Sequence, residues 1–270
     1  MRPPAVAGSW YPGGAAALAA EIDRHLAAAR PPAMPGRLVA LVSPHAGLRY
    51  SGPVAAWGYS LLRGLTAPTF VLVGPSHRIP FDGVSVWPRG EWQTPLGPLA
   101  IDEELAGRLL AADRHLVDDA RPHLGEHSLE MQTPFLKHLV PEARIVPLLM
   151  GSQAREEVEM LAAALGRALG GRPALLIASS DLSHYHPSAE AAVLDARVVE
   201  RVRAFDAEGL MDLLERRHDH ACGGGPMVAV MKAAAALGAG TARVLRYADS
   251  GDVPAGDKSQ VVGYVSAAFS

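Results

Sequence analysis

Three histidines stand where chemistry is expected in an α/β protein, directly after short apolar runs typical of buried strands. They are His45, His77 and His184, which follow the runs 38–42, 69–73 and 174–179. The carboxyl ends of neighbouring parallel strands meet at one edge of a sheet, and α/β proteins bind their ligands there. Imidazole is the commonest metal ligand among side chains. The pattern therefore predicts one metal site built by three loops.

The single cysteine of the chain, Cys222, adds a fourth metal-binding group. It precedes the stretch Gly223-Gly224-Gly225-Pro226 and a predicted helix over 226–237. A helix N-terminus stabilises a thiolate, so we expect a lowered thiol pKa, and a thiolate is the form that binds metals. Taken singly, each histidine is also typical of a hydrogen-bonded loop, and a lone buried cysteine is often inert. The four together favour the metal site.

The elements that must position these side chains alternate between strand and helix. Further strands are expected at 83–87, 144–150, 242–248 and 260–268. Helices are expected at 14–30, 52–63, 102–112, 126–140, 153–169, 188–204, 207–217 and 226–237. This alternation predicts a sheet with helices on both faces. Because no Pro/Ser-rich linker divides the chain, we expect one three-layer α/β/α domain over 1–270, with a central mixed, mostly parallel sheet.

Composition excludes several classes of protein. Hydrophobic residues make up 49% and charged residues 20% of the 270 residues, which is enough to fill a core. A net charge of −3 without any Lys/Arg block argues against nucleic-acid binding. One cysteine cannot form an intramolecular disulfide. The chain shows neither a signal-peptide core nor an apolar run of membrane-spanning length. We therefore expect a cytoplasmic protein with no membrane and no nucleic-acid partner.

Seven short blocks in a fixed order resemble the Memo family, whose bacterial and archaeal members are known as AmmeMemoRadiSam system protein B. The blocks are AGSWYP (7–12), PHAGLRYSG (44–52), GPSHR (74–78), EHSLEMQTPFL (126–136), DLSHY (181–185), CGGGP (222–226) and SGD (250–252). They span essentially the whole chain. The family is similar in fold to class III extradiol ring-cleaving dioxygenases of the LigB type, which are non-haem iron enzymes. The resemblance thus implies a LigB-like fold.

The resemblance also implies roles for the candidate residues. His45, His77 and Cys222 match the family's metal ligands, and His184 matches the acid/base histidine of the dioxygenases. Asp181, three residues before His184, is expected to orient that imidazole by a hydrogen bond and so fix its tautomer.

Two further groups are expected around the centre. Trp10 and Tyr50 match aromatic residues that line the family's pocket, although N-terminal packing explains Trp10 almost as well. Glu126, His127 and Glu130 open the helix expected at 126–140, where spacings of three and four residues put side chains on one face. That face either forms a pocket wall, with Glu126 or His127 moving protons, or serves helix capping.

The ligand set leaves the metal and the function open. The dioxygenases use two histidines and a carboxylate, whereas Cys222 supplies a softer thiolate that suits Fe(II), which we favour, as well as Cu or Zn. Ring cleavage is not inherited from a fold. We expect a metal-dependent oxidoreductase acting on an unknown small molecule. The alternatives are a non-catalytic peptide- or protein-binding module, working with the AMMECR-type and radical SAM partners that the family's name implies, and a zinc hydrolase.

Overall fold

The computed structural model describes residues 1–65 and 69–270, with residue 218 described by its backbone alone. Its strands are β1 (Ala40–Ser43), β2 (Thr69–Pro75), β3 (Val84–Val86), β4 (Glu91–Trp92), β5 (Leu99–Ile101), β6 (Leu116–Asp118), β7 (Arg144–Met150), β8 (Ala174–Ser179), β9 (His184–His186), β10 (Ala242–Asp249) and β11 (Val261–Phe269). Its helices are α1 (Ala15–Ala28), α2 (Leu48–Tyr59), α3 (Glu103–Ala112), α4 (Thr133–Leu139), α5 (Arg155–Leu169), α6 (Ser188–Arg203), α7 (Ala207–Arg216) and α8 (Gly224–Ala236).

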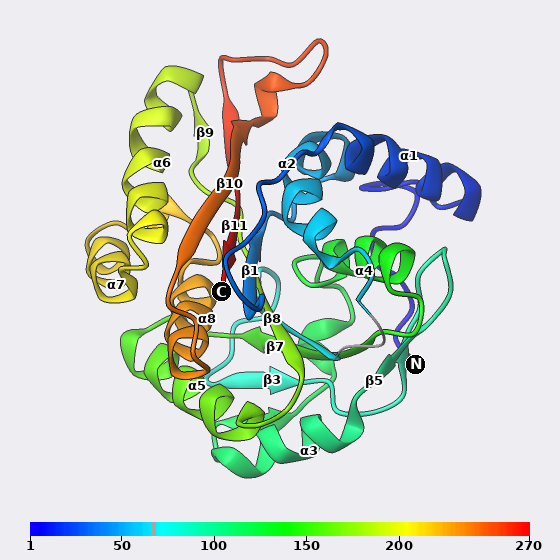
Figure 1. Cartoon of the computed structure of the whole chain (residues 1–270), viewed down its shortest axis with the longest axis vertical. Coiled ribbons are helices and arrows are strands. Elements are labelled where there is room, and N and C mark those ends of the chain that lie inside the picture. The colour runs from blue at the N-terminus through cyan, green and yellow to red at the C-terminus, as the bar shows by residue number, and fades with distance from the viewer. Residues whose placement is uncertain (66–68) are drawn as a thin grey trace.

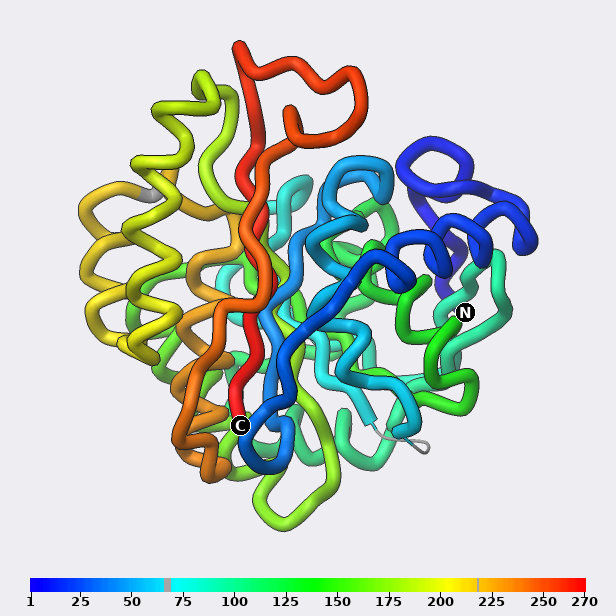
Figure 2. The backbone as a smooth tube through the Cα atoms, turned by 45° about the horizontal axis from the view of Figure 1, so that its top comes forward, coloured from blue at the N-terminus to red at the C-terminus, as the bar shows by residue number. Residues whose placement is uncertain are grey.

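The strands form one mixed sheet in the order β10-β11-β1-β8-β2-β7-β3-β6. Its four central strands, β1, β8, β2 and β7, run parallel to one another. On either side, β11 is antiparallel to β1, and β3 is antiparallel to β7. Figure 2 shows β10 and β11 side by side along the middle of the molecule. The predicted mixed sheet is confirmed, and its parallel centre aligns four carboxyl ends along one edge.

Helices cover both faces of this sheet. In Figure 1, α1, α2 and α4 lie to one side, and α5, α6, α7 and α8 lie to the other. The central strands are therefore buried on both faces, which explains their continuous apolar runs, such as 70–73 and 175–178. The predicted α/β/α arrangement is confirmed. None of the described helices has the length and apolar character needed to cross a membrane.

The helix expected at 126–140 was wrong in its first half. Residues 130–132 form a 3-10 helix, and α4 begins only at Thr133. The cause is Glu126, whose carboxylate accepts hydrogen bonds from the backbone N–H groups of His127 and Ser128. Such side-chain bonds compete with helical ones. Glu126 and Glu130 consequently do not share a helix face.

The start of α2 was also misplaced, because the helix begins at Leu48 and not at residue 52. Gly52 and Pro53, two poor helix formers, lie inside α2. Because of them, the sequence pattern does not indicate the first turn of the helix. Gly52 is required by packing, since a Cβ there would lie 2.7 Å from the His25 ring. The earlier start of α2 leaves only two residues, Ala46 and Gly47, between His45 and the helix.

A buried ion pair fastens the N-terminal segment to the site region. Arg2 Nη1 lies 2.7 Å from Glu130 Oε2, and both side chains are 1% exposed. The same carboxylate accepts hydrogen bonds from the backbone N–H groups of Ala5 and Val6 and from the Tyr11 hydroxyl. Glu130 therefore sets the course of the segment that carries Trp10, a role that the sequence did not reveal.

We predict that Glu130→Ala lowers the free energy of unfolding by about 3–5 kcal/mol, because it leaves the buried Arg2 guanidinium unpaired. Urea unfolding measures the loss. Glu142→Ala, at an exposed position, is the matched control and should stay within about 0.5 kcal/mol of the wild type. A loss below about 1 kcal/mol for Glu130→Ala would contradict the anchoring role.

Candidate metal centre

Two loops that follow parallel strands and the turn before α8 bring the three predicted ligands together. His45 follows β1, His77 follows β2, and Cys222 lies just before α8. One ligand atom from each of these side chains lies within 4.8 Å of the others. His45 Nε2 and Cys222 Sγ are 3.2 Å apart. Residues far apart in the sequence thus form one compact N/N/S group.

A hydroxyl beneath His45 fixes the tautomer of its imidazole. Ser179 Oγ donates to the Ser128 carbonyl and accepts from Gln132 Nε2. Its hydrogen is thereby used, so the 2.9 Å contact with His45 Nδ1 requires that Nδ1 carries the proton. The lone pair of Nε2 then faces Cys222. Burial, followed by the nearby His77, lowers the pKa of His45 well below its ordinary value and keeps the ring neutral, which is the metal-binding form.

A carboxylate plays the corresponding part for His77. Glu126 Oε1 lies 3.0 Å from His77 Nδ1, and Oε2 accepts the His77 backbone N–H at 2.5 Å. Burial alone would raise the pKa of Glu126, but hydrogen bonds from His127 and His77 outweigh it and hold that pKa far below its ordinary value. Glu126 therefore stays ionised and orients His77 with Nε2 free, a common arrangement behind metal-binding histidines.

A third imidazole and an indole cover this pair. The His127 ring stacks on His77 at a centroid distance of 4.8 Å, and the Trp10 ring lies 4.3 Å from His127. His127 also meets His45 edge-on at 5.5 Å. His77, Glu126 and His127 form a second group with metal-ligand spacing, which shares His77 with the first. The structure thus places Trp10 and His127 at the site.

The expected low thiol pKa of Cys222 was wrong. Burial, and then the Asp181 carboxyl, raise the pKa of the thiol. Cys222 precedes Gly223, the N-cap of α8, so the helix terminus does not offset these effects. The sulfur accepts a hydrogen bond from the Asp181 backbone N–H at 3.4 Å. A bound cation would reverse the preference, because a coordinating thiol loses its proton outright.

The expected hydrogen bond from Asp181 to His184 was also wrong. Asp181 Oδ1 accepts the His45 backbone N–H at 2.7 Å, and no contact with His184 is found in the described part of the chain. His184 lies on β9, which pairs with Val262 of β11 and draws the imidazole away from Asp181. Burial raises the pKa of Asp181 to about 7 and lowers the pKa of His184. His184 remains close enough to affect the pKa of His45 electrostatically.

Tyr50 and Trp10 both lie beside Gly47, since a Cβ built there would lie 3.8 Å from Tyr50 Cδ2 and 4.0 Å from Trp10 Cα. Both are partly exposed, at 41% and 37%. Tyr50 lines a cavity of about 640 Å³ together with Trp57 and Arg246. The two aromatic residues are linked through the loop after β1, where the Leu48 backbone N–H donates to the Trp10 carbonyl at 2.8 Å.

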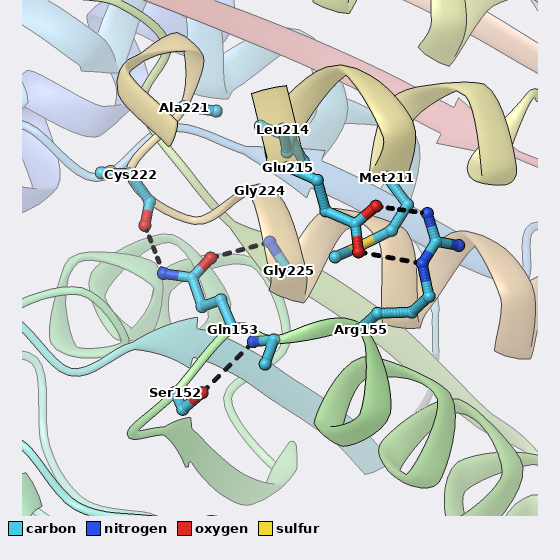
Figure 3. Close-up of a pocket in the computed structure, with 11 residues that line it drawn as sticks. Ser152, Gln153, Arg155, Met211, Leu214, Glu215, Ala221, Cys222, Gly224 and Gly225 are labelled. Carbon is cyan, nitrogen blue, oxygen red and sulfur yellow. Dashed lines mark hydrogen bonds and ion pairs between the residues drawn. The ribbon is translucent and has the colours of Figure 1, made fainter. Parts of the chain in front are cut away.

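A further polar residue near the ligands was missed by the sequence analysis. Gln153 follows β7, the fourth parallel strand, so its position resembles those of His45 and His77. Figure 3 shows its amide between Cys222 and Gly225, at the wall of a cavity of about 500 Å³. A polar residue just beyond a buried strand was the available signal, but glutamine is not a metal ligand by type.

Comparison with known proteins decides the family. The family described as Memo-like protein matches residues 2–268. The chain belongs to the Memo family. It is 39% identical to a MEMO1 family protein of Methanothermobacter thermautotrophicus, with 98% of each chain covered. It is 37% identical to a MEMO1 family protein of Thermotoga neapolitana, with 100% of each chain covered. The Memo resemblance noted in the sequence is therefore confirmed.

The fold has a counterpart among solved structures. An uncharacterized protein from Escherichia coli K12 superposes with a TM-score of 0.52 at 18% sequence identity, covering 85% of this chain and 100% of that one. At this identity the similarity shows the fold alone. It supports the architecture of this Memo-family chain and leaves the site to be argued from its own residues.

We predict that Glu126→Gln lowers the free energy of unfolding of the metal-free protein by about 2 kcal/mol at pH 7. A carboxyl whose folded pKa is depressed contributes stability above its ordinary value of 4.5 and loses it as the pH falls further. The difference from the wild type should therefore shrink by about 2 kcal/mol on going from pH 7 to pH 3, most of it below pH 4.5. Urea unfolding at three pH values measures it, with exposed Glu142→Gln as control. A difference independent of pH would contradict the ionised state.

Proposed function

We propose that this Memo-family chain holds one metal ion through His45, His77 and Cys222 and acts as a metal-dependent oxidoreductase on a small substrate. The observation that carries the proposal is the compact N/N/S group, whose ligand atoms lie within 4.8 Å of one another. The occupied Nδ1 atoms of both imidazoles support it, because they leave Nε2 as the free donor on each ring.

The donor set fits a transition metal. Two neutral imidazoles and one thiolate suit Fe(II), which we favour, and also Cu and Zn. Three protein ligands leave coordination positions open, as catalytic sites require. A redox-active ion bound there would supply electrons to O2 or to a reducible substrate. The resemblance to LigB-type dioxygenases adds the same expectation at the level of reaction class.

The surrounding residues have separable tasks in this proposal. Ser179 and Glu126 orient the two imidazoles, and Asp181 holds the backbone of His45. His184 accepts protons, since burial lowers its pKa and keeps it uncharged at neutral pH. Trp10 shields the imidazoles from water through its contact with His127. Glu126, which its low pKa keeps ionised, orients His77 in this proposal and does not serve as a general acid.

We predict that protein purified without oxygen carries up to one equivalent of metal, with iron as the expected element, and that His45→Ala and Cys222→Ala lose this metal during purification, because the two remaining ligands hold an ion only weakly. Elemental analysis of both variants measures it. His115→Ala, which changes an exposed histidine paired with Asp113, is the control and should retain the metal. Metal-free wild type that also fails to take up Fe(II), Cu or Zn on reconstitution would contradict the proposal.

Activity requires a separate test. Oxygen uptake by the iron-loaded protein is measured with a panel of catechols and other small reductants. His184→Ala should retain iron and lower turnover by about 10²–10⁴-fold, the usual contribution of a general acid or base. Full iron loading without turnover on any substrate would contradict the oxidoreductase assignment. Zinc as the native ion would instead favour the hydrolase.

A second candidate function rests on the exposed aromatic side chains. Trp10 and Tyr50 are large apolar residues with more than a third of their surface exposed, which suits the capture of a peptide or protein segment. The partners implied by the family resemblance are AMMECR-type and radical SAM proteins. Binding of either purified partner to the wild type, lost in Trp10→Ala while metal content is unchanged, would favour this module over catalysis.

A further inference from the structure

The turn that follows Cys222 has no side chains that could pack against the rest of the protein and hold it in place. Three glycines follow the cysteine, and close neighbours exclude larger residues. A Cβ at Gly223 would lie 2.3 Å from the Ser179 carbonyl oxygen, and one at Gly224 would lie 2.6 Å from a Leu214 methyl group. Because these positions have no side chains, other groups must hold the turn against its own backbone freedom.

One side of this turn also lacks packing from the rest of the chain. A cavity of about 500 Å³ lies against it, between the start of α5, α7 and the N-terminus of α8. The walls include Ser152, Met211, Leu214, Cys222, Gly224 and Gly225. Hydrogen bonds therefore contribute more to fixing the position of Cys222 than they would if side chains filled this space.

Gln153 makes two of those hydrogen bonds. Its Nε2 donates to the Cys222 carbonyl oxygen at 2.8 Å, and its Oε1 accepts the Gly225 backbone N–H at 2.7 Å. Figure 3 shows the amide spanning the turn. On the opposite side, the Cys222 backbone N–H donates to the Asp181 carbonyl oxygen at 3.2 Å. The peptide group before the cysteine is thus held by Asp181, and the one after it is held by Gln153 together with Ser180 Oγ, which accepts the Gly223 N–H at 2.9 Å.

We propose that Gln153 is a positioning residue of the metal centre, which clamps the Cys222–Gly225 turn and so holds the cysteine sulfur beside His45 Nε2. The inference rests on the proposed metal site and extends it to the fourth parallel strand, β7. Metal–ligand distances tolerate changes of only about 0.2 Å. Loosening a turn that carries one of three ligands therefore weakens binding, although Gln153 never touches the ion.

The amide suits this task for a chemical reason. It offers one donor and one acceptor, matching the Cys222 carbonyl and the Gly225 N–H. A carboxylate in its place keeps the acceptor but sets a second oxygen against the Cys222 carbonyl. A leucine keeps the approximate shape and loses both bonds. Gln153→Glu and Gln153→Leu therefore remove one or both halves of the clamp.

The test uses Co(II) as the probe on the full-length, metal-free protein. Titration gives the dissociation constant, and the near-ultraviolet absorption of the thiolate–Co(II) bond reports whether Cys222 is a ligand. We expect Gln153→Leu to bind Co(II) about 10–100-fold more weakly, the usual cost of removing a group that orients a ligand. We expect a weaker or shifted thiolate band as well, and a smaller loss for Gln153→Glu. Gln260→Leu, at an exposed position, should behave as the wild type.

A double-mutant cycle shows whether Gln153 acts through the cysteine. In a Cys222→Ala background, Gln153→Leu should cost no more than about 2-fold in Co(II) affinity, because the ligand that the clamp positions is absent. Thermal melting of the metal-free variants shows whether a loss of Co(II) affinity comes from unfolding instead. If Gln153→Leu fails to fold, the test uses Gln153→Glu, because the glutamate side chain has the same shape as glutamine.

The possible outcomes distinguish a failure of the Gln153 inference from a failure of the proposed metal site. A wild type with no thiolate–Co(II) band overturns the metal site itself. A wild type with the band, and Gln153 variants with the same affinity and spectrum, overturns the clamp and leaves the metal site standing. An equal loss in the presence and absence of Cys222 overturns it as well, since Gln153 would then act by another route.

Discussion

The parallel register of β1, β8 and β2 is the constraint on which the site depends. Ser43 at the end of β1 pairs with Ser179 at the end of β8, and Val73 of β2 pairs with Ala178. The three strands therefore end at one level, and the loops that leave them enter the same space. His45 and His77 follow from this alignment alone. Cys222 needs a second condition, the close approach of the glycine turn to β8, which the absence of side chains at Gly223 permits.

The imidazoles of His45 and His77 are oriented by two polar groups of different kinds. Each ring must present Nε2, so each Nδ1 needs a fixed acceptor. For His45 the acceptor is a neutral hydroxyl, Ser179, which is itself held by Gln132. For His77 it is the ionised Glu126. A carboxylate makes an imidazole a stronger donor than a hydroxyl does, so the two histidines would be unequal ligands for the proposed ion. Neither acceptor could be identified from spacing, since both lie far from their histidines along the chain.

The sequence predicted the central strands well and the loops between them poorly. The expected strands at 144–150 and 174–179 agree with β7 and β8 residue for residue, because strands buried on both faces are continuous apolar runs. The helix start at 126 failed because a single carboxylate, Glu126, draws its own backbone out of helical geometry. The predicted hydrogen bond from Asp181 to His184 was wrong because β9, which carries His184, pairs with β11, a strand far away in the sequence. Burial, which raises the pKa of Cys222, is likewise a tertiary effect that no local pattern encodes.

Anomalous X-ray scattering from crystals grown without oxygen tests the central claim most directly. Data collected on both sides of the Fe, Cu and Zn absorption edges would identify and locate any ion. The account predicts one peak, about 2.0–2.4 Å from Nε2 of His45, Nε2 of His77 and Sγ of Cys222. A fully loaded crystal with no peak at these atoms, or with the ion held by Glu126 and His127 while Cys222 stands apart, would contradict it.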